Sequence, residues 1–141
     1  MKFQYILASH GRFAEGIKES VELILGKQDN IQTICAYVGL TDEISTTIEN
    51  MISSFSPDDN IIVISDIMTG SVNHAFMHFI KRDNIHLIAG LNLPLLIGLI
   101  IGEEVVTKKS EVKSFIINSL SQSKDNIRYC NAIYSDNKKI P

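Results

Sequence analysis

Short apolar runs alternate with helix-like segments four times along the chain, and this alternation limits the possible folds more than any other feature. The apolar runs are FQYILA (3–8), NIIVIS (60–65) and IHLIAGL (85–91), and IQTICAYV (31–38) alternates like a strand. Helix-like patterns follow at 12–25, 41–55 and 71–80, and another helix begins near Pro94. Continuous apolar strands that alternate with helices are typical of a parallel sheet covered on both faces. We therefore predict an α/β doubly wound fold.

The length and pattern predict a single domain over residues 1–141, with sheet order 2-1-3-4 and helices on both faces. After Gly102 a last helix would present Val112, Phe115, Ile116 and Leu120 on one face. The weak alternation of IRYCNAIY (127–134) predicts an edge strand. Residues from about 128 to 141 would then form a C-terminal strand and tail, with the last residues frayed.

Charge and composition exclude several classes of protein. With 13 basic residues, 16 acidic residues and a formal net charge of −3, the chain has no basic stripe for a nucleic-acid backbone. The opening residues lack the apolar core of a signal peptide, and the most apolar stretch (86–102) is too short to span a bilayer. Cys35 and Cys130 have no redox or zinc spacing. We expect a cytoplasmic protein with free thiols that does not bind nucleic acid.

Two loops carry the polar residues best placed for chemistry. In an open parallel α/β sheet, ligands bind beyond the carboxyl ends of the strands where the winding reverses. With order 2-1-3-4, the loops SHGR (9–12) and SDIMTGS (65–71) flank that crevice and contain His10 and Asp66. A carboxylate that accepts the proton of one imidazole nitrogen leaves the other nitrogen free to act as a nucleophile. We predict that His10 and Asp66 are catalytic.

The same loops hold groups suited to a phosphoryl group. Its oxygens could be bound by backbone N–H groups near Gly11 and Gly70, by the hydroxyls of Thr69 and Ser71, and by two helix N-termini. This chemistry requires no metal and no cofactor. A plain structural role stays open from the spacing alone, because a histidine beside glycine is commonly a turn residue and Asp66 or Ser71 could cap a helix.

At these residues the sequence resembles the enzyme IIA component of the mannose-family (mannose/fructose/sorbose) phosphoenolpyruvate-dependent sugar phosphotransferase system. The opening ILASHGRFAEGIKESVELILG is similar to the family's first strand, His-Gly pair and first helix. The segment VISDIMTGSVNHAF resembles its Asp-containing turn, and LIAGLNLPLLIGLI resembles its fourth strand and Asn-x-Pro helix start. The resemblance covers roughly residues 3–120 in order and spacing.

The resemblance implies a phosphotransferase with a phosphohistidine intermediate at His10. His10 would accept a phosphoryl group from the phosphocarrier HPr and donate it to a IIB protein, which phosphorylates the transported sugar. The membrane IIC and IID components would take part indirectly. Because no second domain follows in the sequence, we expect IIB to be a separate chain. The resemblance also implies a homodimer in which the C-terminal strand, here near 127–134, is exchanged between subunits.

The turn after Asp66 departs from the family pattern at two positions. Thr69 stands where the family usually has the first glycine of a Gly-Gly pair, and Val72 stands where it usually has proline. A β-carbon limits positive φ at Thr69, so the loop shape and the choice of partner could differ.

Three alternative functions stay open at this level. His74 and His78 are four residues apart and could hold a metal in a hydrolase or lyase, although no HExxH motif is present. A flavodoxin-like module could bind a nucleotide or flavin, but the chain lacks GxGxxG and an aromatic-rich loop. The phosphotransfer subunit of a dihydroxyacetone kinase uses a related domain, although the residues after Asp66 fit the sugar branch better.

Overall fold

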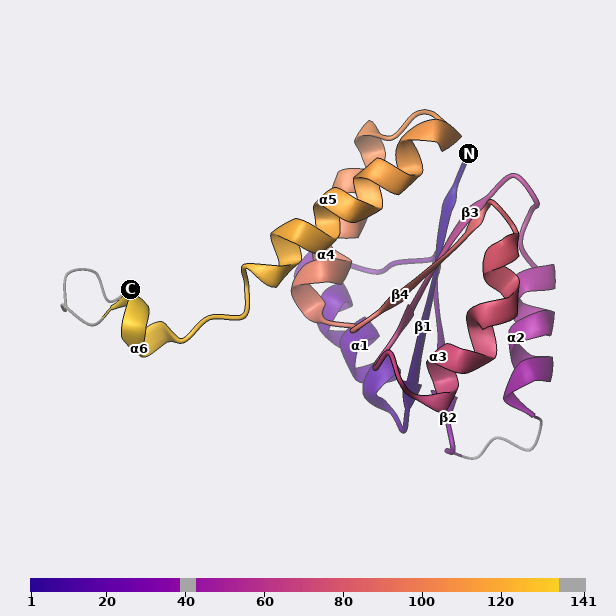
Figure 1. The fold of residues 1–141 in the computed structure, drawn as a ribbon, viewed down its shortest axis with the longest axis horizontal. Helices are drawn as coiled ribbons and strands as arrows, with labels where there is room; N and C mark the ends of the chain where they lie inside the picture. Colours follow the sequence, from indigo (N-terminus) through magenta and orange to yellow (C-terminus); the bar gives the residue numbers. More distant parts are fainter. Residues whose placement is uncertain (39–42, 135–141) are drawn as a thin grey trace.

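Four parallel strands form the sheet at the centre of the structure (Figure 1). The structure is a computed structural model that describes residues 1–38 and 43–134. The strand order β2-β1-β3-β4 confirms the predicted order 2-1-3-4. The strands are β1 (Phe3–His10), β2 (Ile31–Ala36), β3 (Asn60–Ser65) and β4 (Ile85–Ala89).

Helices cover both faces of this sheet, as the continuous apolar strands predicted (Figure 1). One face carries α1 (Phe13–Leu25), α4 (Leu93–Gly102) and α5 (Val112–Lys124), and the other carries α2 (Ile44–Ser53) and α3 (Ser71–Phe76). The short 3₁₀ helices are η1 (Met77–Lys81), η2 (Glu103–Val105) and η3 (Lys109–Glu111). Because successive strand residues point to opposite faces, each strand contributes side chains to two hydrophobic cores, one on each face of the sheet.

The two cores divide the strand residues by alternation. On the α1 side the strands contribute Tyr5, Leu7, Ile62 and Ile64. On the α2 side they contribute Ile6, Ala8, Ile61 and Val63. All eight side chains are fully or almost fully buried, which fixes the register of β1 against β3 because a one-residue slip would exchange the two sets.

Several helix boundaries differ slightly from the expected ones. The helix predicted for 71–80 is α-helical only to Phe76 and continues as the 3₁₀ helix η1. The helix predicted for 41–55 spans Ile44–Ser53, and the expected start at Thr41 lies outside the described residues. Helix α4 begins where predicted, because the Asn92 side chain accepts a 2.9 Å hydrogen bond from the N–H of Leu95.

The C-terminal segment differs from the prediction. Residues 127–134 contain the short helix α6 (Cys130–Ile133) in place of the expected edge strand, while 135–141 lie outside the described residues. In Figure 1 the chain after α5 leads α6 away from the sheet. A strand needs hydrogen bonds from a neighbouring strand, whereas this segment forms local bonds such as the 3.0 Å bond from Tyr134 N–H to the Cys130 carbonyl.

Within residues 1–38 and 43–134, no helix is both long enough and apolar enough to cross a membrane.

Candidate active site

The ends of β1 and β3 bring His10 and Asp66 together. The two strands are parallel neighbours in which Ala8 lies opposite Ser65, and the N–H of Asp66 donates to the Ala8 carbonyl over 3.1 Å. His10 ends β1, and Asp66 follows the last residue of β3. The sheet order therefore places the two residues side by side at the carboxyl edge, as the sequence predicted.

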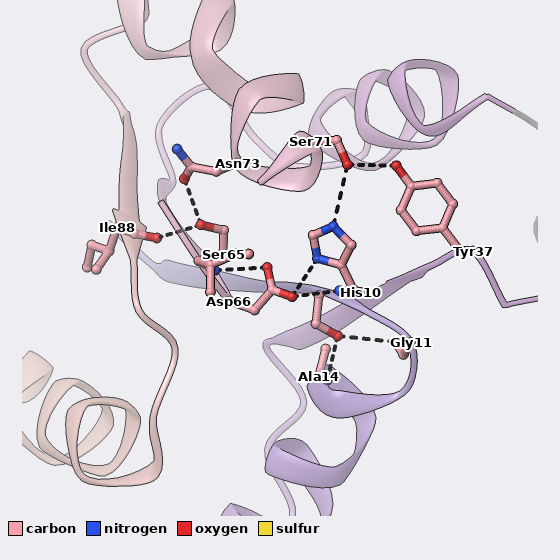
Figure 2. Close-up of polar contacts among 11 residues, drawn as sticks. His10, Gly11, Ala14, Tyr37, Ser65, Asp66, Ser71, Asn73 and Ile88 are labelled. Carbon is pink, nitrogen blue, oxygen red and sulfur yellow. Dashed lines mark hydrogen bonds and ion pairs between the residues drawn. The ribbon is translucent and has the colours of Figure 1, made fainter. Parts of the chain in front are cut away.

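Asp66 binds His10 through two hydrogen bonds to one carboxylate oxygen (Figure 2). Its Oδ2 accepts from the backbone N–H of His10 over 2.7 Å and lies 2.8 Å from the ring Nδ1. Its Oδ1 accepts from the N–H of Ile67 over 2.9 Å. These bonds fix both the carboxylate and the plane of the imidazole ring.

The charge of Asp66 decides the tautomer of His10. Burial alone would raise the pKa of Asp66, but the hydrogen bonds from His10 and Ile67 outweigh it and bring the pKa below its ordinary value of 3.8. Asp66 is therefore ionised at neutral pH and can only accept hydrogen bonds. In the neutral imidazole of His10 the proton therefore lies on Nδ1, and Nε2 carries the lone pair.

Ser71 and Tyr37 lie on the Nε2 side of the ring (Figure 2). The Ser71 Oγ is 3.5 Å from Nε2, and the Tyr37 hydroxyl is 2.6 Å from the same Oγ. Ser71 was among the predicted residues. Tyr37 was missed because the predicted strand 31–38 included it, whereas β2 ends at Ala36. The switch-point rule also did not select the loop after β2.

Gly11, in the loop after β1, was expected to offer its N–H to a phosphate, but this N–H is already bonded within the protein. The N–H that was expected to face a phosphate donates to the Ala36 carbonyl over 2.9 Å, so it is occupied by the backbone of β2. Gly11 instead supplies a left-handed turn, with φ of 61°. Ser9 stabilises the turn, because its hydroxyl accepts from the N–H of Ala14 over 2.8 Å and donates to the Gly11 carbonyl.

The loop after β3 packs tightly against His10. A β-carbon at Gly70 would lie 2.9 Å from Cε1 of His10, so a larger residue would displace the ring. Thr69 is exposed in the same turn. Asn73 was known only as part of the resembling segment, yet it shapes this loop: it accepts from the Ser65 hydroxyl over 2.6 Å and donates to the Met68 carbonyl over 3.1 Å.

The alternative metal site was the pair His74 and His78. His74 lies on α3 and His78 lies on η1, where its ring packs against Phe79. In the part of the chain that the structure describes, no group of three or more His, Cys, Asp and Glu side chains is arranged to hold a metal ion.

The fold is that of a IIA component of a sugar phosphotransferase system, as comparisons with known proteins show. The family model for EIIA-man, described as PTS system fructose IIA component, matches residues 4–117. The chain belongs to this family. It is 25% identical over 129 residues to the PTS system fructose-specific EIIA component of Bacillus subtilis (strain 168), an alignment that covers 89% of this chain and 84% of the relative.

Solved structures agree with this assignment. A Klebsiella pneumoniae protein, whose name refers to a permease of the phosphoenolpyruvate-dependent sugar phosphotransferase system, is 45% identical, with a TM-score of 0.86 and 93% of each chain covered. The mannose/sorbose-specific IIA subunit from Enterococcus faecalis is 23% identical, with a TM-score of 0.69. That alignment covers 92% of this chain and 95% of the subunit, and it shows the shared fold.

We predict that Asp66→Asn removes an acid-dependent part of the stability. Because the pKa of Asp66 is lowered in the folded state, its contribution is present above the ordinary value of 3.8 and is lost as the pH falls below it. At neutral pH the variant should lose roughly 1–3 kcal/mol of unfolding free energy. Urea denaturation at a series of pH values should show the two proteins converging below about pH 4.

The control for this comparison is Asp58→Asn, which changes an exposed aspartate in the turn before β3. This variant should follow the wild type at every pH. A constant difference between wild type and Asp66→Asn down to the acid limit would contradict the role of the ionised carboxylate.

Proposed function

We propose that His10 carries a phosphoryl group from phospho-HPr to a separate IIB protein in the cytoplasm, and that IIB then phosphorylates the transported sugar. Family membership gives the chain the general role of a IIA component in sugar phosphotransfer, which implies HPr and IIB as partners. The proposed role of His10 rests on the hydrogen bond between Asp66 and Nδ1 of His10. The His10 side chain is also 40% exposed, so a partner protein can reach it. We include residues 1–141 in one IIA domain.

In the proposed transfer His10 forms and breaks the bonds to phosphorus, and Asp66 balances the charge of its ring. The lone pair of Nε2 forms a new N–P bond as the N–P bond of the donor histidine breaks, and that electron pair returns to the donor nitrogen. Nδ1 keeps its proton, so the phosphorylated ring gains positive charge. The ionised Asp66, 2.8 Å from Nδ1, stabilises that charge. Attack by a nucleophile of IIB on the same phosphorus regenerates the neutral imidazole.

The phosphoryl oxygens would be bound by the loop after β3. The Ser71 hydroxyl lies closest to Nε2, at 3.5 Å, and is the first donor in this proposal. Thr69 belongs to the same turn and is a further candidate. So is the N–H of Gly70, because its bond to the Ile67 carbonyl is long, at 3.5 Å. The N–H of Gly11 is left out, because it already donates to the Ala36 carbonyl.

Exposed apolar side chains near the catalytic loops offer contacts to partner proteins. Phe13 follows the loop after β1 and is 48% exposed, and Met68 in the loop after β3 is 77% exposed. Protein surfaces that bind partners commonly place such residues around a functional group. We assign these two residues to the surface that meets HPr and IIB.

We predict that the protein gains the mass of one phosphoryl group when it is mixed with phosphoenolpyruvate, enzyme I and HPr. His10→Ala should abolish the label, whereas His78→Ala, which removes an exposed histidine on η1, should keep it. Intact mass spectrometry measures the gain, and lability in acid with stability in base identifies a phosphohistidine. An unlabelled wild-type protein beside phosphorylated HPr would refute the relay.

We also propose that the protein forms a homodimer through the free edge of β4. Beside this strand, between α5 and the α3–η1 segment, lies an apolar groove of about 530 Å³. Its lining includes Met77, Ile80 and Ile117, which are 44–54% exposed. An uncovered strand edge beside an apolar groove is a site for strand addition from another chain. The C-terminal segment of a second copy is the proposed occupant, because α6 is led away from its own sheet (Figure 1).

A buried polar atom in the same groove supports this arrangement. Nε2 of His86, on β4, is buried and has no hydrogen-bond partner among the described residues. A buried polar atom without a partner is costly, so a segment that covers the groove could also satisfy this nitrogen. The C-terminal segment would exchange the local hydrogen bonds of α6 for bonds to the edge of β4.

We predict that Ile117→Glu weakens the dimer, because it places an unpaired charge in the apolar groove. The dissociation constant should rise about ten-fold or more. The matched control is Ile24→Glu on α1, an isoleucine of similar exposure that does not line the groove. Light scattering after size exclusion should show dimers for the wild type and the control. A monomeric wild-type protein would contradict the dimer.

A further inference from the structure

Tyr37 has an unusual backbone conformation beside the catalytic histidine. It directly follows β2, and its φ of 66° makes it the one residue other than glycine with positive φ in the described ranges 1–38 and 43–134. Its side chain is mostly exposed, at 71%. A tyrosine gains nothing from a left-handed backbone, and such outliers persist where surrounding contacts require them.

Two side-chain contacts of Tyr37 join it to the site. Its ring stacks on the imidazole of His10, with centroids 5.6 Å apart and an angle of 28° between the planes. Its hydroxyl lies 2.6 Å from the Oγ of Ser71, which in turn lies 3.5 Å from Nε2 (Figure 2). Because so much of the side chain is exposed, these contacts hold it in place and core packing does not.

We propose that Tyr37 is a positioning residue for phosphoryl transfer, an inference that rests on the proposed function of His10. A serine hydroxyl has a single hydrogen to donate. When the Tyr37 hydroxyl donates to Ser71 Oγ, the hydrogen of Ser71 is left to point toward Nε2. The stacked ring of Tyr37 keeps the imidazole plane aligned with this hydroxyl.

The same arrangement serves the phosphorylated state. The phosphoryl group moves from the donor nitrogen to Nε2 with no change in the protons of Tyr37 or Ser71. Ser71 then donates to a phosphoryl oxygen, and Tyr37 continues to donate to Ser71. Donation along a chain of hydroxyls polarises each bond in it, so Ser71 becomes a stronger donor to the developing charge. Tyr37 thus acts on the reaction through Ser71.

A double-mutant cycle tests this route. The rates of phosphoryl transfer from phospho-HPr are measured by rapid quench for wild type, Tyr37→Phe, Ser71→Ala and the double variant. Tyr37→Phe should slow transfer about five-fold, because the hydroxyl chain loses one hydrogen bond. The double variant should be no slower than Ser71→Ala alone, since Tyr37 acts through that hydroxyl. Effects that multiply would overturn the proposal.

Two further variants separate positioning from folding. Tyr37→Asn suits a left-handed backbone, so its urea midpoint should not fall although transfer slows at least as much as in Tyr37→Phe. Ser54→Ala removes an exposed hydroxyl at the end of α2 and should leave the rate unchanged. A labelled wild type with an unchanged rate in Tyr37→Phe would overturn this inference alone. An unlabelled wild type would overturn the proposed function and this inference with it.

Discussion

The bond between Asp66 and His10 is the interaction on which the rest of the site depends. One carboxylate oxygen holds both the backbone N–H and the ring Nδ1 of His10, so it fixes the position and the tautomer of the ring together. This bond crosses from the end of β3 to the end of β1, and only adjacent parallel strands place those two ends together. Sheet order, register and the buried cores on both faces are therefore conditions for the chemistry.

Three loops around His10 shape the rest of the site. The turn after β1 is set by Ser9 and by the positive φ of Gly11. The turn after β3 is held by Asn73 and leaves space for the ring at Gly70. Tyr37, which directly follows β2, contacts the hydroxyl of Ser71 across the end of β1. The Nε2 side of the ring thus faces a hydroxyl, and the Nδ1 side faces a carboxylate, an arrangement that suits the phosphoryl acceptor proposed here.

The sequence predicted the features that follow from periodicity and from chain order. Buried parallel strands read as apolar runs, and the residues at their ends, His10, Asp66 and Ser71, then fall at one edge of the sheet. The role of Tyr37 could not be predicted, because it depends on a backbone angle and a loop outside the switch point. The C-terminal segment was misjudged for a related reason: a weak alternation cannot become a strand without a neighbouring edge, and local bonds form α6 instead.

The most direct test of this account is the position of the phosphoryl group on the imidazole of His10. Isotope-labelled protein phosphorylated through HPr can be examined by nitrogen–phosphorus correlation in solution NMR. We predict phosphorus on Nε2 and a proton retained on Nδ1, because Asp66 occupies Nδ1. Phosphorus on Nδ1 would contradict it, since the carboxylate would then have to release the ring before transfer.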